Sequence, residues 1–244
     1  MTFKLRKLSH GLGAEVCDID VTAPMSESAF GKIHRAFLDY GVLLFRNQNI
    51  TREQHLAFSR RFGELDRHDA FPSDRHPTIP ELMLVTNEPQ PDGTPSVSRY
   101  TGRRWHTDMS HTLEPSLGSL LRCWKIPGVG GDTLFASMYA AYDALSERMK
   151  RYLNGLTAVH DGEHVYRGTY ANLGVQDKPT YPRSVHPVVR THPATGRKAL
   201  YVNRLMTDHI IGLPREESDH ILNTLFDHAE NPAWIYEHAW TPGD

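Results

Sequence analysis

The chain contains 244 residues, 39% of them hydrophobic and 23% charged, which is ordinary for one globular domain with a buried core. Its formal net charge of −2 gives no protein-wide positive field, so we expect neither nucleic acid nor a membrane surface as a partner. No apolar run of membrane-spanning length or signal-peptide pattern is present, and Cys17 and Cys123 match no zinc or redox spacing, which predicts a cytoplasmic protein with reduced thiols.

The N-terminal part of the sequence predicts three short strands and two helices. The strands are expected at 3–8, 14–19 and 42–46, and the helices at 26–41 and 51–62. Ser26 is a favourable N-cap for the first helix, and Gly41 is a typical stop. The second helix opens on a capping box formed by Thr51 and Gln54.

Residues 67–104 are rich in Pro, Asp, Asn and Gly and contain one strand-like island, at 82–86. Long irregular segments inside compact domains are often binding loops or lids. We therefore predict that 67–104 is a lid over an active site.

From residue 105 onward, short strand-like segments dominate. Strands are predicted at 117–126, 133–137, 156–161, 184–192, 199–203 and 234–240, and helices at 137–154 and 213–229. Many short strands between Gly and Pro turns are typical of a double-sheet jelly roll and not of a parallel α/β sheet. We predict one domain over 1–244 with an α+β, mainly β fold. Its core would be a double-sheet jelly roll with a few helices packed outside it.

The sequence WHTDMSHTLEP, at 105–115, contains a pattern typical of metal binding. On a strand, His106 and Asp108 would project from the same face. Imidazole together with carboxylate suits Fe(II), Mn(II) or Zn(II), and this pair provides two of the three protein ligands of a non-heme Fe(II) site. In a chain with 15 histidines, the alternative is a chance pair satisfied by other contacts. We interpret His111 as a supporting or surface residue and Glu114 as part of a turn.

A longer set of motifs resembles one known family. In chain order the motifs are WHTDMSHTLEPSLGSLL, PGVGGDTLFASMYAAYDAL, LTAVHD, HPVVRTHPATGRKALYVN and WTPGD. Together they resemble the taurine dioxygenase/TfdA family of Fe(II)- and 2-oxoglutarate-dependent dioxygenases, and the similarity extends from GVLLFRNQ to the last residue. The resemblance implies a double-stranded β-helix (jelly roll) core with helices packed on one sheet and iron between the sheets.

The resemblance also implies roles for individual residues. His106 and Asp108 match the first two iron ligands and are the predicted catalytic pair. Thr133, in GGDT, matches the threonine that binds a carboxylate of 2-oxoglutarate. His68 matches a histidine of the substrate pocket, and Phe71 stands at the place of a pocket aromatic residue. Phe71 cannot donate the hydrogen bond that a tyrosine would donate there.

The family's second histidine ligand follows the W-x-P-G-D motif in an Asn-Arg-…-His string, with the 2-oxoglutarate arginine further on. The sequence ends at Asp244, so we expect the third iron ligand beyond Asp244. His186 and His192 are alternatives, but the family pattern places them in a core strand and turn, where Arg190 would organise the strand or a buried ion pair. The remaining histidines match no ligand position: His209, His220, His228 and His238.

These assignments predict a dioxygenase that uses Fe(II), 2-oxoglutarate and O₂, hydroxylates a small organic anion next to a heteroatom, and releases succinate and CO₂. The resemblance implies a sulfonate, an aryloxyalkanoate or an alkyl sulfate as the substrate, and a homo-oligomer (dimer or tetramer). One alternative is a catalytically inactive jelly-roll protein that binds a small anion or a partner. Another is a zinc hydrolase, although no general base is suitably placed for it.

Overall fold

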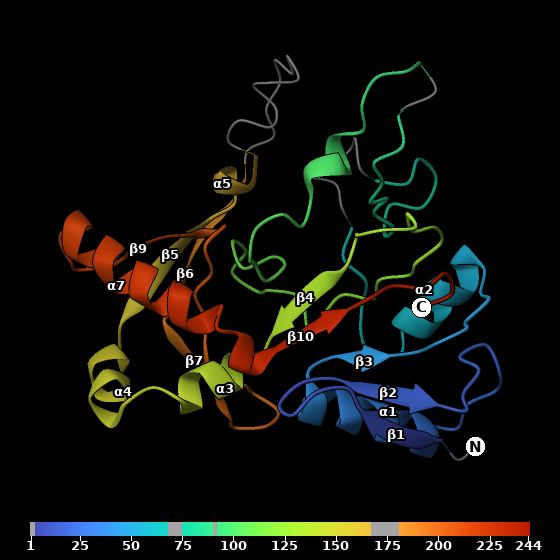
Figure 1. Ribbon diagram of the computed structural model, residues 1–244, viewed down its shortest axis with the longest axis horizontal. Coiled ribbons are helices and arrows are strands. Elements are labelled where there is room, and N and C mark those ends of the chain that lie inside the picture. Colours follow the sequence, from blue (N-terminus) through green and yellow to red (C-terminus); the bar gives the residue numbers. More distant parts are fainter. Residues whose placement is uncertain (1–2, 68–74, 90–91, 167–180) are drawn as a thin grey trace.

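The computed structural model describes residues 3–67, 75–89, 92–166 and 181–244, which form helices and four small sheets (Figure 1). The first sheet contains β1 (Lys4–Lys7), β2 (Ala14–Cys17) and β3 (Leu43–Leu44). The others pair β4 (Thr133–Ala136) with β10 (Ile235–His238), β5 (Thr157–Asp161) with β6 (Arg183–Pro187) and β9 (Thr207–Ile210), and β7 (Val189–Thr191) with β8 (Lys198–Leu200). The helices are α1 (Glu27–Tyr40), α2 (Arg52–Ser59), α3 (Met138–Asp143), α4 (Glu147–Leu153), α5 (Glu163–Tyr166) and α7 (Arg215–Ala229), with 3-10 turns η1 (Val97–Tyr100) and η2 (Pro232–Trp234).

The N-terminal helices begin where their capping residues predict. The Ser26 side chain accepts a hydrogen bond from the Ala29 backbone N–H, and Gly41, at φ 71°, ends α1. The Thr51 and Gln54 side chains form the predicted capping box of α2, which satisfies backbone N–H groups that have no partner inside the helix. Aromatic rings then join the two helices: Phe30, Phe37, Phe58 and Phe62 meet edge to face with centroids 4.9 to 6.1 Å apart.

The main hydrophobic core lies between α7 and the β5–β6–β9 sheet, across which α7 runs in Figure 1. Its buried members are Ala141, Leu153, Ala158, Val188, Leu200, Val202, Ile210, Leu222, Leu225 and Phe226. The single helix predicted over 137–154 is two helices, α3 and α4. Ser146 explains the break, because its side chain accepts from the Met149 N–H and caps a new helix.

Two predicted strands are wrong. At 82–86 the structure has one isolated bridge, between Met83 and Arg75, and 117–126 contains no strand. Among the described residues, the backbone of 117–126 pairs with another segment only at Cys123, which bonds to Gly243 and Asp244 at 2.9 Å. An apolar sequence alone does not make a strand, since a strand needs a neighbour for its backbone groups. Strand β9 was not predicted.

Strands β4 and β10 run between the N-terminal sheet and the α7 core in Figure 1. They pair antiparallel, with Thr133 opposite His238. This pairing brings the GGDT and WTPGD motifs together, although Thr133 and Trp240 are 107 positions apart in the sequence. Within the described ranges, no helix is both long enough and apolar enough to cross a membrane.

Candidate active site

His106 and Asp108 face each other, as the metal-site prediction requires. Their Nε2 and Oδ1 atoms are 3.3 Å apart, with the imidazole 26% and the carboxylate 53% exposed. They do not lie on a strand: residues 106–108 are irregular, and Met109 has a left-handed φ of 57°. The prediction of a strand was therefore wrong while the pairing was right, because a tight turn can also bring two side chains together.

Each member of the pair is held by a second contact. The Arg104 carbonyl oxygen lies 2.7 Å from His106 Nδ1, which favours a proton on Nδ1 and directs Nε2 toward Asp108. Ser119 Oγ donates to Asp108 Oδ2 at 2.5 Å. Oδ2 is thereby engaged, and Oδ1 is the carboxylate oxygen that faces the imidazole.

The electrostatics of His106 fit a site that exchanges a proton for a metal. The hydrogen bond to Asp108 raises the pKa of His106 above its ordinary value of 6.5; burial opposes the rise and the Arg104 carbonyl supports it. A divalent cation would take the place of the Nε2 proton between the same two donors. Histidine ligands usually donate their other N–H to a carbonyl or carboxylate, and His106 has that contact. Among the described residues, no group of three His, Cys, Asp or Glu side chains could hold a metal.

Thr133 begins β4, directly after the turn that contains Gly130 and Gly131. Gly131 has φ 88°, and a Cβ there would lie 2.8 Å from Ile126 Cδ1, so the turn is closely packed as well as left-handed. Trp240 Nε1 donates to Thr133 Oγ1 at 2.8 Å. Since an indole N–H can only donate, the Thr133 hydroxyl keeps its own hydrogen for an acceptor such as a carboxylate.

The sequence did not identify Ser119 or Trp240 as parts of this site. Their partners lie 11 and 107 positions away along the chain. The WTPGD motif contains Trp240, but the residues around Trp240 in the sequence do not indicate which distant side chain accepts its indole N–H.

Other predicted residues are placed as follows. His68 and Phe71 lie outside the described residues. His186 is buried, and its Nε2 lies 2.8 Å from Ser184 Oγ and 2.9 Å from the Thr112 carbonyl oxygen, so it serves the core as predicted.

The structure also describes Arg190, interpreted above as a residue that organises a strand or a buried ion pair, and His111, interpreted as a supporting or surface residue. The Arg190 guanidinium lies 4.8 Å from the centre of the Tyr201 ring, which is consistent with a residue that organises the strand. His111 is only 3% exposed, so it is a buried residue and not a surface one.

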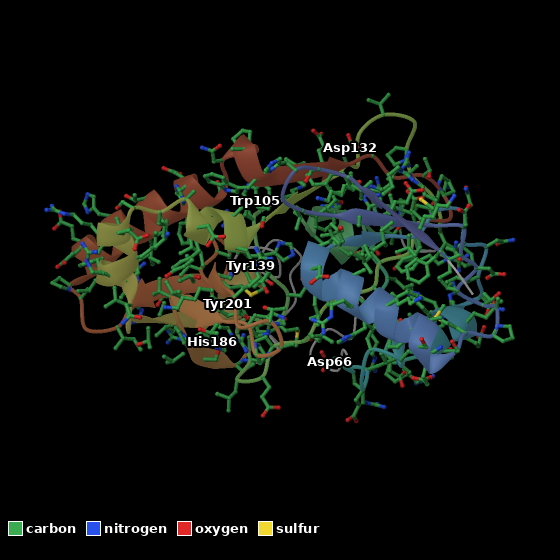
Figure 2. All side chains as sticks on the ribbon, turned by 90° about the horizontal axis from the view of Figure 1, so that it is seen from below. Asp66, Trp105, Asp132, Tyr139, His186 and Tyr201 are labelled. Atoms are coloured by element: carbon green, nitrogen blue, oxygen red, sulfur yellow. The ribbon has the colours of Figure 1, made fainter. Side chains whose placement is uncertain are left out.

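A polar cluster contacts the 105–112 segment at Ser110 and Thr112. Figure 2 labels two of its members, His186 and Tyr201, which lie next to each other with ring centroids 5.2 Å apart. His160 completes the group, with its ring 5.3 Å from His186 and 5.6 Å from Tyr201. Burial, followed by the charge of His186, lowers the pKa of His160 to about 4, so this imidazole is neutral at neutral pH.

The chain is similar to a known family along nearly its whole length. The family described as "Taurine catabolism dioxygenase TauD, TfdA family" matches residues 4–244. An (S)-phenoxypropionate/alpha-ketoglutarate-dioxygenase from Sphingobium herbicidovorans is 33% identical over 99% of this chain and 84% of its own length. An alpha-ketoglutarate-dependent sulfonate dioxygenase from Saccharomyces cerevisiae is 31% identical over 98% of this chain, and the chain spans 58% of that relative's length. The crystal structure of a taurine dioxygenase from Burkholderia xenovorans superposes with a TM-score of 0.81 at 32% identity, covering 99% of this chain and 77% of that one.

Proposed function

Because the chain belongs to the TauD/TfdA family of taurine catabolism dioxygenases, we propose that it is an Fe(II)- and 2-oxoglutarate-dependent dioxygenase that hydroxylates a small organic anion next to a heteroatom. The main support for this proposal is that His106 Nε2 and Asp108 Oδ1 face each other at 3.3 Å. Iron, 2-oxoglutarate and O₂ would together supply the oxidising chemistry, with succinate and CO₂ as co-products. Nitrogen and oxygen donors of this kind are what a non-heme Fe(II) centre uses.

The protein's own residues would position these groups. The Arg104 carbonyl holds Nδ1 of His106, so Nε2 is the nitrogen available to a metal. The Ser119 hydroxyl holds one oxygen of Asp108 and leaves the other facing His106. The third ligand remains a prediction and would be a second histidine.

Thr133 would bind a carboxylate of 2-oxoglutarate. Its hydroxyl accepts from the Trp240 indole, and its own hydrogen remains for a negatively charged oxygen. A hydrogen bond to a charged group contributes about 1.5–3 kcal/mol, so loss of this contact would weaken the binding of 2-oxoglutarate.

The substrate class is a sulfonate, an aryloxyalkanoate or an alkyl sulfate. The names of the yeast and Sphingobium relatives, a sulfonate dioxygenase and a phenoxypropionate dioxygenase, support the first two. His68 and Phe71 stay the predicted substrate contacts, with 67–104 as the predicted lid.

We further propose that the helices and sheets belong to one domain with a jelly-roll core. The likeness to the Burkholderia taurine dioxygenase supports this. A cytoplasmic location is supported by the free thiols of Cys17 and Cys123. Assembly into a dimer or tetramer stays a prediction.

The test is succinate release from 2-oxoglutarate with Fe(II), O₂ and a panel of sulfonates, aryloxy acids and alkyl sulfates. We expect substrate-dependent turnover that His106→Ala and Asp108→Asn abolish. His220→Ala is the matched control, because His220 is an exposed histidine on α7 whose Nδ1 contacts the backbone carbonyl of Glu216 in the same helix. Substrate binding without any succinate release would favour the alternative of an inactive anion-binding protein.

A further inference from the structure

Ser110 is the centre of a buried hydrogen-bond network beneath the predicted metal ligands. It lies two residues after Asp108, and its side chain is completely buried. The Ser110 hydroxyl is 3.1 Å from His160 Nδ1, 3.3 Å from Asn203 Nδ2 and 3.1 Å from Met206 Sδ. These three partners come from β5 and from the segment before β9, so one side chain joins the ligand segment to two distant parts of the chain.

The donors and acceptors of this network fit together. The Asn203 side-chain oxygen accepts from the Met206 backbone N–H at 2.8 Å, which leaves the Asn203 amide NH₂ to donate to Ser110. The Ser110 hydroxyl donates to the Met206 sulfur, so its remaining lone pair would accept from His160 when the neutral imidazole carries its proton on Nδ1. All three contacts of the Ser110 hydroxyl are then made without a charged group, although His160 Nε2 is buried and makes no hydrogen bond to the described residues. Three partners from two parts of the chain restrict the Ser110 side chain and, with it, the segment that carries it.

The backbone of the same segment is held as well. Ser184 Oγ, on β6, donates to the Ser110 carbonyl at 2.9 Å. His186 Nε2 then contacts the carbonyl of Thr112 at 2.9 Å. The segment that follows Asp108 therefore contacts the β5–β6 pair through both side chain and backbone.

On the other side of the ligand pair, the Trp105 carbonyl accepts from the Leu205 backbone N–H at 3.3 Å. His106 and Asp108 thus lie between two anchors that both lead to the segment 203–206. The ligands themselves are half-exposed on an irregular turn, which has no secondary structure of its own to fix them. The contacts of Trp105 and Ser110 with residues 203–206 therefore hold this turn instead of regular secondary structure.

We propose that Ser110 is a positioning residue for the predicted metal site. Fixed by His160 and Asn203, it sets the backbone from which Asp108 presents its carboxylate to the metal. The inference rests on the proposed function, since it assumes that His106 and Asp108 bind a metal. Residues that orient metal ligands typically change metal affinity by about 10- to 100-fold when they are removed.

The first test needs no metal. Hydrogen–deuterium exchange of the metal-free protein would compare wild type with Ser110→Ala. Ser218→Ala is the matched control, because Ser218 is equally buried and accepts a hydrogen bond from the Ile210 backbone, but lies on α7. We expect Ser110→Ala to accelerate exchange in peptides covering 104–112, and Ser218→Ala to leave those peptides unchanged even if its Tm falls by a similar amount.

The second test is a Mn(II) titration of the same proteins, with Mn(II) in place of Fe(II) to avoid oxidation. We expect Ser110→Ala to weaken Mn(II) binding by about 10- to 100-fold and Ser218→Ala to leave it unchanged. If Ser110→Ala does not fold, Ser184→Ala removes the contact to the Ser110 carbonyl and is expected to give the same pattern.

Two results would overturn the proposal. One is unchanged exchange over 104–112 in the Ser110 and Ser184 variants. The other is an equal loss of Mn(II) affinity in the Ser110 and Ser218 variants, which would indicate a general loss of stability. Failure of the wild type to bind Mn(II) at all would instead count against the proposed function, while the exchange measurement would still decide whether Ser110 orders the segment.

Discussion

Acidification from about pH 7.5 to about pH 5 is expected to destabilise the fold through His160 by about 2 kcal/mol. The cause is the burial of a neutral imidazole: His160 is completely buried, and its pKa is lowered from 6.5 to about 4. As the pH falls, the unfolded chain takes up a proton near pH 6.5, while the folded chain does not until about pH 4. The stability is therefore complete above the unfolded pKa and is lost as the pH falls toward the folded pKa.

The magnitude follows from the two pKa values. At about pH 5 the unfolded imidazole is almost fully protonated and the folded one is about one-tenth protonated. The proton-binding factor, 1 + 10^(pKa − pH), is then about 30 times larger for the unfolded state than for the folded state. This ratio corresponds to about 2 kcal/mol. Other histidines whose pKa is lowered by burial or partial burial act in the same direction: His55, His111, His186, His192 and His238. His106, whose pKa is raised, acts in the opposite direction, so the wild type alone does not isolate His160.

The variant His160→Asn does isolate it. The asparagine amide can occupy the place of Nδ1 and keep the contact to Ser110, but it takes up no proton. Urea denaturation at the two pH values would give the free energy of unfolding of each protein. We expect His160→Asn to be less stable than the wild type near pH 7.5 and to lose about 2 kcal/mol less on acidification. Equal losses in the two proteins would refute the reasoning, because they would show that His160 does not stay neutral in the folded state.

Three further predictions concern single positions. Gly162→Ala is expected to lower the free energy of unfolding in urea by about 1–3 kcal/mol, because a Cβ there would lie 2.7 Å from His111 Cδ2 and 2.8 Å from Tyr181 Cβ. The control is Gly31→Ala on α1, where a Cβ would meet nothing within 4 Å; this change is expected to stabilise the protein by about 0.5–1 kcal/mol. Trp240→Phe is expected to raise the KM for 2-oxoglutarate about fivefold through loss of the bond to Thr133, and an unchanged KM with unchanged kcat would contradict the role given to Thr133. Mn(II) affinity is expected to fall about tenfold per pH unit below the pKa of His106, because the metal displaces a proton that Asp108 stabilises; a pH-independent affinity between about pH 6 and about pH 8 would argue against His106 as a ligand.

Helix boundaries were predicted better than strands. Ser26 and Thr51 bond to backbone groups three residues further on, so the relevant contacts lie within one turn and the sequence shows both partners. The segment 117–126 has the composition of a strand, but its pairing depends on residues far away in the sequence. The division of 137–154 into two helices was readable from Ser146, whose capping contact is also local.

The candidate site divides along the same line. The spacing of His106 and Asp108 is local, and the two side chains meet as predicted, although the strand geometry used to predict it was wrong. A turn with Met109 in the left-handed conformation also brings the two side chains together. An H-x-D pattern therefore predicts which side chains meet better than it predicts the backbone conformation that carries them. Family resemblance added Thr133 but could not show that its hydroxyl already accepts from Trp240.

The parts of the site that fix its geometry have partners far apart in the sequence. The contacts of Ser110 with His160, Ser184 and Asn203 span 50, 74 and 93 positions. A serine two residues after an H-x-D pattern carries no local signal of this role, and a buried histidine in LTAVHD is as typical of a core strand as of a functional site. The two half-exposed ligands depend on these buried contacts for their order, because an irregular turn without such contacts would lose conformational entropy on binding a metal. A site of this kind is therefore specified twice: by a short motif that supplies the donors, and by a distributed polar core that makes the donors rigid before the metal arrives.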